Sequence, residues 1–310
     1  MRLFKPKFEI LEQQYNDGTY INDMYKHIEK CGRTCYKSED KITDTSAWPF
    51  VRRMIASEHN AMLEHGTVYM YLCFSSPAVD IKYMKYFEIY RKYKANKHSR
   101  VVKNVVDNFY TYIYITTNFR VIVENGWEDD LKFICAPTEY HAKRYTVQFT
   151  CDRGVSHEYV RHRVFSFAQE STRYCNYAKD KFDNSVSYMY LPWCDTDNAV
   201  EPEHNVMEYD TILPYNTYWW NAIDWWLWSI SAAETAYFKL LDFGWTAQQA
   251  RTVLPTGLKT ELVMTGFVDD WKHFFDLRAI GTTGAPHPQA KELAEPLMVE
   301  FASRGYLEEN

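Results

Sequence analysis

A short window near the middle of the chain gathers residue types that bind anions. It runs from Arg161 to Tyr174 and contains three arginines, one histidine, one glutamine and three serine or threonine hydroxyls. Guanidinium groups bind phosphates and carboxylates through paired hydrogen bonds and stay charged at any working pH. His162 lies between Arg161 and Arg163, whose positive charges favour its neutral form. The window therefore predicts a preformed anion pocket. The alternative is a surface helix with solvated arginines, and composition alone favours that alternative, because most charge clusters are solvated.

The composition limits the classes of partner. A net charge of −6 argues against attraction of the whole molecule to nucleic acid or to an anionic membrane, so an anion site must be a local positive patch. The 310 residues allow one large domain or two ordinary ones, and a hydrophobic fraction of 46% supports a sizeable core. The 25 tyrosines and 10 tryptophans indicate flat contact surfaces or aromatic-lined pockets.

The cysteines and the N-terminal sequence indicate a reducing cytoplasm. Seven cysteines form no CxxC pair and no metal-ligand spacing, so most are expected to be buried free thiols. The stretch from Met1 to Lys7 has no apolar run of signal-peptide type, and no window is long enough to span a membrane. The histidines show no HxxxH or HExxH spacing, so no metal is expected. The sequence also lacks a GxGxxG motif and a Walker loop.

Hydrophobic periodicity gives a coarse secondary structure. Strands are expected at 7–12, 68–74, 109–124 and 145–151, the third closed by an Asn125-Gly126 turn. Helices are expected at 20–29, ending before Gly32, at 47–57, at 155–161, along the tryptophan-rich stretch 219–240, from Thr246 to Pro255, and at 260–280. The Lys- and Tyr-rich segment 80–103 is interpreted as a solvated helix with tyrosines on its inner side, or alternatively as a nucleic-acid face. With no internal repeat and no linker, the pattern predicts one α+β domain with an insertion.

Five sequence elements, in order, resemble the flavin-dependent thymidylate synthases, the ThyX family. The family signature is Arg-His-Arg, seven residues, then Ser, x, Arg and Tyr, and the window 161–174 matches it in full. The other four matching elements are Arg33 to Tyr36, Glu58 to His65, Ala250 to Pro255, and His273 to Arg278 followed by His287-Pro288-Gln289. The resemblance implies a single ThyX-like domain over residues 1–310, with a mainly antiparallel sheet flanked by helices and an insertion at about 75–142.

The same resemblance implies a reaction and its cofactors. Members methylate dUMP to dTMP, taking the carbon from methylenetetrahydrofolate and a hydride from FAD that NADPH has reduced. The flavin would carry the redox chemistry and the protein would supply binding and electrostatics. Members are homotetramers whose active sites are shared between subunits, so a homotetramer is expected here.

Site residues follow from the resemblance, position by position. Arg278 is expected to face the uracil ring and Ser171 to lie near the phosphate, as the catalytic residues. The residues expected to contact the flavin are Arg161, His162, Arg163, Gln169, His273, Ala61 and Glu64. The residues expected to contact dUMP are Glu158, Arg161, Gln169, Glu170, Ser171, Thr172, Arg173, Arg251 and Arg278.

Three positions depart from the family pattern. Glu158 stands where Gln is common, and a carboxylate there must be hydrogen-bonded or it repels a nucleotide phosphate. Ala61 and Met62 replace Ser or Thr followed by Pro, and the segment 267–269 replaces Asn-x-Arg, which suggests a different hold on the flavin tail.

Two other functions are compatible with the sequence. One is a binding module for single-stranded nucleic acid, based on the segment 80–103 and the abundant aromatic residues. The other is a flavoprotein relative that has lost thymidylate synthesis. The intact signature favours the synthase over both.

Overall fold

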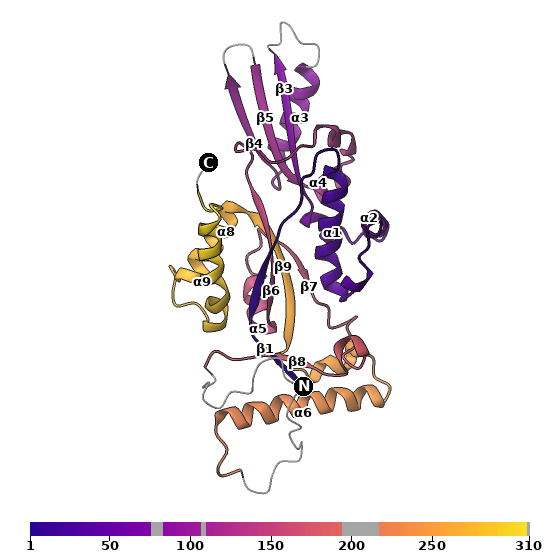
Figure 1. Cartoon of the computed structure of the whole chain (residues 1–310), viewed down its shortest axis with the longest axis vertical. Coiled ribbons are helices and arrows are strands. Elements are labelled where there is room, and N and C mark those ends of the chain that lie inside the picture. Colours follow the sequence, from indigo (N-terminus) through magenta and orange to yellow (C-terminus); the bar gives the residue numbers. More distant parts are fainter. Residues whose placement is uncertain (76–82, 107–109, 194–216, 309–310) are drawn as a thin grey trace.

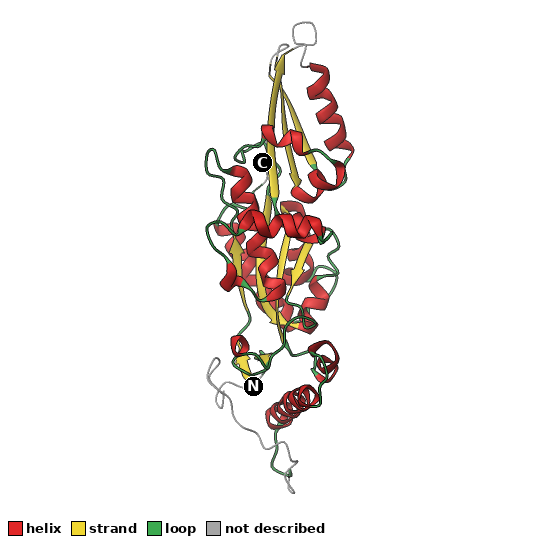
Figure 2. Cartoon of the chain, turned by 90° about the vertical axis from the view of Figure 1, so that its right-hand side faces the viewer, coloured by secondary structure: helices red, strands yellow, loops and turns green. Residues whose placement is uncertain are grey.

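The computed structural model describes residues 1–75, 83–106, 110–193 and 217–308. These residues form three tiers along one long axis, each tier built around its own β-sheet (Figures 1 and 2). The mixture of helices with mainly antiparallel sheets confirms the predicted α+β class.

The middle tier holds the central sheet, with strand order β2-β6-β9-β7 and antiparallel pairing throughout. Its strands are β2 (Lys7–Leu11), β6 (Arg144–Asp152), β7 (Ser166–Gln169) and β9 (Lys259–Phe267). Helices α1 (Tyr20–Tyr36) and α2 (Ala47–Ala56) lie on one side of this sheet, and α8 (Val268–Phe275) and α9 (Pro288–Ser303) lie on the other (Figure 1). Buried side chains of β6, β9, α8 and α9 form one core, with Trp271 and Phe274 fully enclosed.

The upper tier is a three-stranded antiparallel sheet of order β3-β5-β4. Its elements are β3 (Thr67–Ser75), α3 (Tyr83–Ala95), β4 (Arg100–Val106), β5 (Tyr110–Asn118) and α4 (Phe119–Asn125). Its buried side chains form a continuous core with those of α1 and α2. On α3, Tyr93 is buried and donates to Asp130 (3.0 Å), as expected for a solvated helix with inward tyrosines. That the stretch 75–142 is an insertion stays a prediction.

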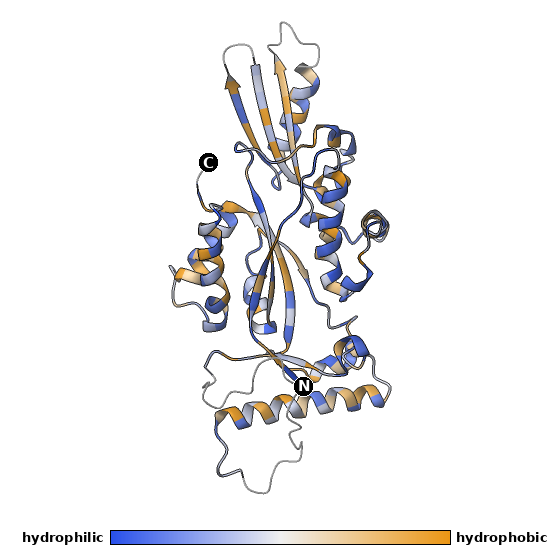
Figure 3. Ribbon diagram, viewed as in Figure 1, coloured by the Kyte–Doolittle hydropathy of each residue, from blue (hydrophilic) through white to orange (hydrophobic). Residues whose placement is uncertain are grey.

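The lower tier is a parallel pair of short strands, β1 (Arg2–Phe4) and β8 (Ser187–Met189), which packs on helix α6 (Ala222–Asp242). Hydrophobic residues run along α6 as well as along the strands (Figure 3). The tryptophan-rich helix begins later than predicted, because Asn221 caps its N-terminus and leaves Trp219 and Trp220 outside. Gly244 follows the last turn with φ +87°, as expected of a glycine at this end.

Several predicted elements agree with the structure. The expected strands at 7–12, 68–74 and 145–151 are β2, β3 and β6, and the expected helix at 47–57 is α2. The helix predicted at 155–161 is α5 (Arg153–Tyr159), which starts after the capping residue Asp152. The Thr246 capping box opens α7 (Ala247–Ala250), and a 3₁₀ turn (Arg251–Val253) leads to Pro255.

Four predicted elements are wrong in part. The first half of the helix predicted at 260–280 is strand β9, a central strand whose continuous apolar run Leu262-Val263-Met264 is buried on both faces and so shows no alternation. The strand predicted at 109–124 ends at Asn118, whose side chain caps α4. The residues from Arg100 to Lys103 belong to β4 rather than to a helix. Helix α1 continues past Gly32 to Tyr36, and that glycine accommodates the ring of Phe50 on α2.

No described helix is both long and apolar enough to cross a lipid bilayer.

Candidate active site

The Arg-His-Arg signature lies in a turn between α5 and β7. Asp152 accepts a hydrogen bond from the Val155 backbone N–H (2.7 Å), which starts α5 and aims its end at this turn. His162 is buried, whereas Arg161 and Arg163 are exposed. Neither exposed guanidinium forms an ion pair with any part of the chain that the structure describes. The window is therefore not a surface helix, and its two outer arginines are available to an anion.

His162 is held as a neutral hydrogen-bond acceptor. Its Nε2 accepts from Nε of Arg278 (3.1 Å), and its ring packs edge-on against Phe274 (5.1 Å between centroids). Burial, the charge of Arg278 and His273 lower the pKa of His162 to about 4. The predicted preference for the neutral form is confirmed, but its causes are burial and Arg278 rather than the flanking arginines.

Arg278 is fixed by three hydrogen bonds to the signature region. It lies in a π-helical turn (Asp276–Ile280) that Gly281 ends with φ +80°. Its Nη1 pairs with the carboxylate of Glu158 (2.5 Å), and its Nη2 donates to the Glu158 backbone carbonyl (3.0 Å). Glu158 thus has the hydrogen-bond partner that a carboxylate at this position requires. His273, on the preceding α8, lies with its ring 6.2 Å from that of His162.

A cavity of about 410 Å³ opens beside Glu158. Its walls include Trp193 and Trp226, together with Gln289, which donates to Asp152 (2.6 Å). The combination of aromatic walls, amide and carboxylate suits a planar ring that carries polar edges.

The last residue of β7 and the residues that follow it form a second group of predicted contacts. Gln169 donates to the Ser156 hydroxyl of α5 (2.9 Å), which joins this group to the helix that carries Glu158. The buried Thr172 accepts from Nη1 of Arg251 (2.9 Å), and Arg173 donates to Gln248 (3.1 Å).

The predicted flavin contacts Ala61 and Glu64 form a third group. They lie in a 3₁₀ helix (Asn60–His65), and Ala61 lines a cavity of about 610 Å³ together with Cys35 and Arg120. The Glu64 carboxylate pairs with Arg120 of α4 (2.6 Å). Among the described residues, Glu64 makes no hydrogen bond or ion pair with the group around Arg278. One chain therefore brings the first two groups together and places the third on a neighbouring surface.

Sequence reasoning missed several residues that hold this site in place. Arg120 occupies the expected insertion, and nothing in its local sequence marks it as a partner of Glu64. Lys259 and Glu261 are two apart on β9, so a strand would place them on one face. The helix predicted at 260–280 hides this alternation, because a helix would not place Lys259 and Glu261 on one face.

Metal ligands and disulfides play no part in the described site. No group of three or more His, Cys, Asp or Glu residues is placed to hold a metal ion in the ranges that the structure covers. Six of the seven cysteines are described, all as free thiols; Cys31, Cys151 and Cys175 are buried, and Cys194 lies outside the described residues.

Comparison with known proteins identifies the family. Residues 139–304 match the family model described as "Thymidylate synthase complementing protein", which is more than half of the chain. The chain therefore belongs to this family, and the predicted family membership is confirmed.

Individual relatives are more distant. A flavin-dependent thymidylate synthase of Geobacter sulfurreducens is 30% identical over 126 residues, which cover 41% of this chain and 43% of the relative. A probable flavin-dependent thymidylate synthase of Paramecium bursaria Chlorella virus 1 is 26% identical over 51% of this chain and 68% of its own length. The corresponding enzyme of Pyrococcus furiosus is 25% identical over 61% of this chain and 68% of its own. The matched region thus spans between 43% and 68% of these relatives.

One solved structure also aligns with this chain. It is the UMP/dUMP methylase PolB from Streptomyces cacaoi bound with 5-Br dUMP, which aligns over 98% of this chain and 93% of its own at 15% identity and a TM-score of 0.41.

Proposed function

We propose that this protein is a flavin-dependent thymidylate synthase, which converts dUMP to dTMP with methylenetetrahydrofolate as carbon donor and NADPH-reduced FAD as hydride source. The observation that carries the proposal is the convergence of Arg278, His162 and Glu158, in a chain of this family. Gln169, which leads into the loop that presents Ser171, Thr172 and Arg173, is bonded to Ser156 on the helix that carries Glu158. Relatives named flavin-dependent thymidylate synthases support it.

The residues present fit a phosphate-bearing flavin. Arg161 and Arg163 are exposed cations that no described carboxylate neutralises, so they can receive an anionic cofactor without breaking an internal pair. His162 and His273 would lie beside the same group, and the cavity at Ala61 would accommodate another part of it. When bound, the flavin supplies the hydride; the methylene carbon comes from the folate.

The protein's own contribution is positioning and charge. Ser171, Arg173 and Arg251 would bind the phosphate of dUMP and fix the position of its ring. Arg278, held rigid by Glu158 and His162, would stabilise negative charge that develops on the pyrimidine. A cation fixed in advance lowers the barrier because no reorganisation is needed when the charge appears.

The first test is NADPH oxidation by the purified protein with added FAD, with and without dUMP, followed by detection of dTMP when methylenetetrahydrofolate is present. Oxidation that rises sharply with dUMP, together with dTMP formation, is the expected result. Bound flavin that responds to neither dUMP nor the folate would instead identify a relative that has lost synthesis. Failure to retain flavin would overturn the proposal.

Substitution of the two proposed catalytic residues tests their roles. Replacement of Arg278 by alanine should lower the turnover rate about 10²- to 10³-fold, the usual effect of losing one preorganised contact to developing charge. Replacement of Ser171 by alanine should also cripple turnover, because the phosphate that positions dUMP loses a contact. Circular dichroism and flavin retention would check that the fold persists. Arg52→Ala is a matched control, because Arg52 is exposed on α2. Near-normal turnover in both variants would disprove these assignments.

A further inference from the structure

The loop that presents Ser171, Thr172 and Arg173 is anchored on the C-terminal end of α1. The last carbonyls of a helix lack partners within the helix and must be satisfied from outside. Here the Cys35 carbonyl accepts from the Ser171 N–H (3.0 Å), while the Tyr36 and Lys37 carbonyls accept from Nζ of Lys181 (3.3 and 2.9 Å). A cation at this position also interacts favourably with the helix dipole. The segment from Ser171 to Lys181 is thus attached at both ends to one helix terminus.

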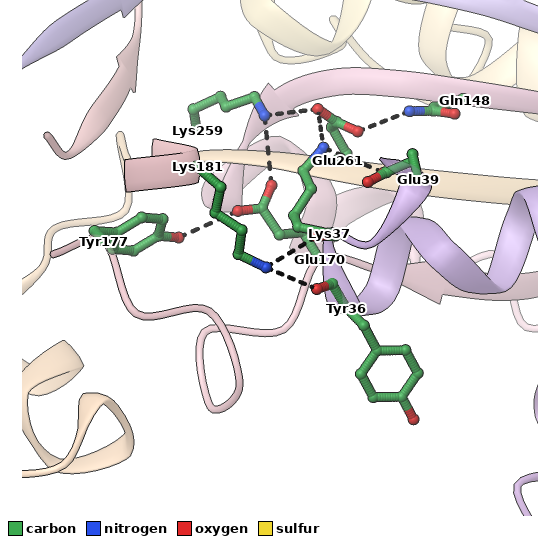
Figure 4. A network of polar contacts seen from close by, with 9 residues as sticks. All are labelled: Tyr36, Lys37, Glu39, Gln148, Glu170, Tyr177, Lys181, Lys259 and Glu261. Atoms are coloured by element: carbon green, nitrogen blue, oxygen red, sulfur yellow. Dashed lines mark hydrogen bonds and ion pairs between the residues drawn. The ribbon is translucent and has the colours of Figure 1, made fainter. Parts of the chain in front are cut away.

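A chain of alternating charges continues from this anchor to the central sheet (Figure 4). Nζ of Lys37 pairs with Glu261 (2.5 Å), and Nζ of Lys259 lies between Glu261 (2.7 Å) and Glu170 (3.4 Å). Gln148 of β6 donates to the second oxygen of Glu261 (2.7 Å). Glu170 immediately precedes Ser171, so the chain of charges ends at the loop itself.

Glu170 is almost fully buried, and Lys259 supplies its only described cationic partner. Its other side-chain partner is the Tyr177 hydroxyl, at 3.4 Å. Its backbone N–H donates to the Glu261 carbonyl (2.8 Å), which ties the start of the loop to β9. A buried carboxylate without a compensating charge is costly, so Glu170 depends on Lys259 to stay where it is.

The same network sets the charge states of its members. Burial alone raises the pKa of the Glu261 carboxyl, but Lys259 and Lys37 outweigh it and lower this pKa to about 2. Burial opposes the charge of Lys259, yet Glu170 and Glu261 keep its pKa above the ordinary value. Both groups are therefore charged across the physiological range.

The adjacent cavity of about 360 Å³ does not favour a ligand site. Four cations line it, and each is already engaged: Arg2 with Asp183, Lys37 with Glu39 and Glu261, Lys181 with the carbonyls of α1, and Lys259 with Glu170 and Glu261. Because its cations are used internally, the network is suited to holding the loop rather than to binding an anion.

We propose that Lys259 is a positioning residue that, through Glu170, holds the Ser171–Arg173 loop in the geometry that binds the nucleotide. The role in nucleotide binding rests on the proposed function, whereas the effect on the loop does not. Without Lys259, the buried Glu170 has no described cationic partner and the partly buried Glu261 keeps only Lys37, so we expect the loop to move off α1 and β9.

The experiment compares Lys259→Met with Lys259→Arg and with the double variant Lys259→Met/Glu170→Gln. Hydrogen exchange of the backbone amides at 170–175 in the ligand-free protein reports the loop alone, and calorimetric titration with dUMP reports its consequence. Lys259→Met should accelerate exchange in this loop and weaken dUMP binding about tenfold or more, a typical coupling for residues in one ionic network. Lys259→Arg keeps the charge and should behave as the wild type, and the double variant should regain most of the exchange protection.

The pH dependence separates positioning from general destabilisation. The charged groups around Glu170 are Lys37 at the end of α1, Lys259 and Glu261 from β9, Lys181 from the 3₁₀ helix Asp180–Phe182, and Glu39 and Asp40 from the 3₁₀ helix Glu39–Lys41. In Lys259→Met the carboxylates lose the cation between them, and acid weakens the repulsion between neighbouring carboxylates, so the loss of dUMP affinity should be smaller at pH 5.5 than at pH 8. A purely structural defect would weaken binding similarly at both.

Lys30→Met is the matched control, because among the described residues Lys30 forms a single ion pair, with Glu9, and both side chains are exposed. Unchanged exchange and dUMP affinity in Lys259→Met would overturn the proposal. If Lys259→Met does not fold, the double variant Lys259→Met/Glu170→Gln decides instead. If its amides at 170–175 exchange as fast as those of a variant with a generally destabilised fold, the proposal is overturned. A wild-type protein that fails to bind dUMP would refute the proposed function, while exchange at 170–175 would still decide the role of Lys259.

Discussion

Glu158 shows how one side chain reconciles an acidic residue with an anion site. Its carboxylate forms an ion pair with Nη1 of Arg278 and so neutralises part of the positive charge that would attract the nucleotide. Arg278 does not depend on that carboxylate for its position, because the Glu158 backbone carbonyl and Nε2 of His162 also hold it. The carboxylate therefore tunes the charge of the site more than its shape.

Replacement of this carboxylate by an amide should strengthen nucleotide binding. Glu158→Gln keeps a hydrogen-bond acceptor for Arg278 and removes one negative charge, whose repulsion of a phosphate in a hydrated site is on the order of 1 kcal/mol. The dissociation constant for dUMP, measured by calorimetry, should fall by about fivefold. Glu295→Gln on α9 makes the same change in net charge at an exposed remote pair and should have no effect. Weaker binding by Glu158→Gln would mean that the carboxylate positions Arg278 after all.

Strand β9 shows which kind of element the sequence does not predict. Elements with a clean period or a clear cap, such as α2, β6 and the Thr246 box, were predicted because local sequence determines them. Strand β9 was missed because a central strand buried on both faces shows no alternation, and its Lys, Glu, Leu and Met residues also favour helices. Tertiary packing, not propensity, selects the strand.

The same limit applies to the site. The signature residues and Arg278 were predicted because a family resemblance supplies contacts that local sequence does not contain. The ionic network was not predicted, because Lys37, Glu170 and Lys259 lie more than 85 residues apart and only the fold brings them together.

Gly32 allows helices α1 and α2 to pack closely, and its replacement should lower the stability of the protein. A Cβ at this position in α1 would lie 2.6 Å from the Phe50 ring of α2 and 3.6 Å from Cγ of Met62. Gly32→Ala should gain about 1 kcal/mol of helix propensity but lose more to overpacking, so the free energy of unfolding should fall by about 1–2 kcal/mol. Urea unfolding measures this difference.

A double-mutant cycle tests its cause. Phe50→Leu removes the atoms that the new Cβ would meet, so Gly32→Ala should be neutral or stabilising in that background. An equal loss in both backgrounds would show that the clash between α1 and α2 is not responsible.

The whole molecule exposes more surface than a compact chain of its size. Its accessible area is 16892 Å², whereas the scaling for monomeric proteins of 36.9 kDa gives about 13,600 Å². The three-tier shape explains part of the difference (Figure 2). Large aromatic side chains also lie exposed around α6, with Trp219 and Phe243 each 82% exposed. Surface of this extent and chemistry is typical of a protein that buries it against other copies.

The family resemblance implies a homotetramer, and this exposed surface offers area for its interfaces. We expect the purified protein to show about four times the mass of one chain by light scattering on a sizing column. Trp219→Ser and Phe243→Ser remove apolar area from the exposed aromatic surface around α6 and should shift the mass toward smaller species as the protein is diluted. Val299→Ser on α9, at 61% exposure, is the control and should leave the mass unchanged.

In a tetramer, the two groups of site residues that one chain leaves apart, around Arg278 and around Glu64, would meet across a subunit boundary. Flavin binding should therefore weaken as the tetramer dissociates. A wild-type protein that stays at 36.9 kDa while binding flavin tightly would contradict both expectations.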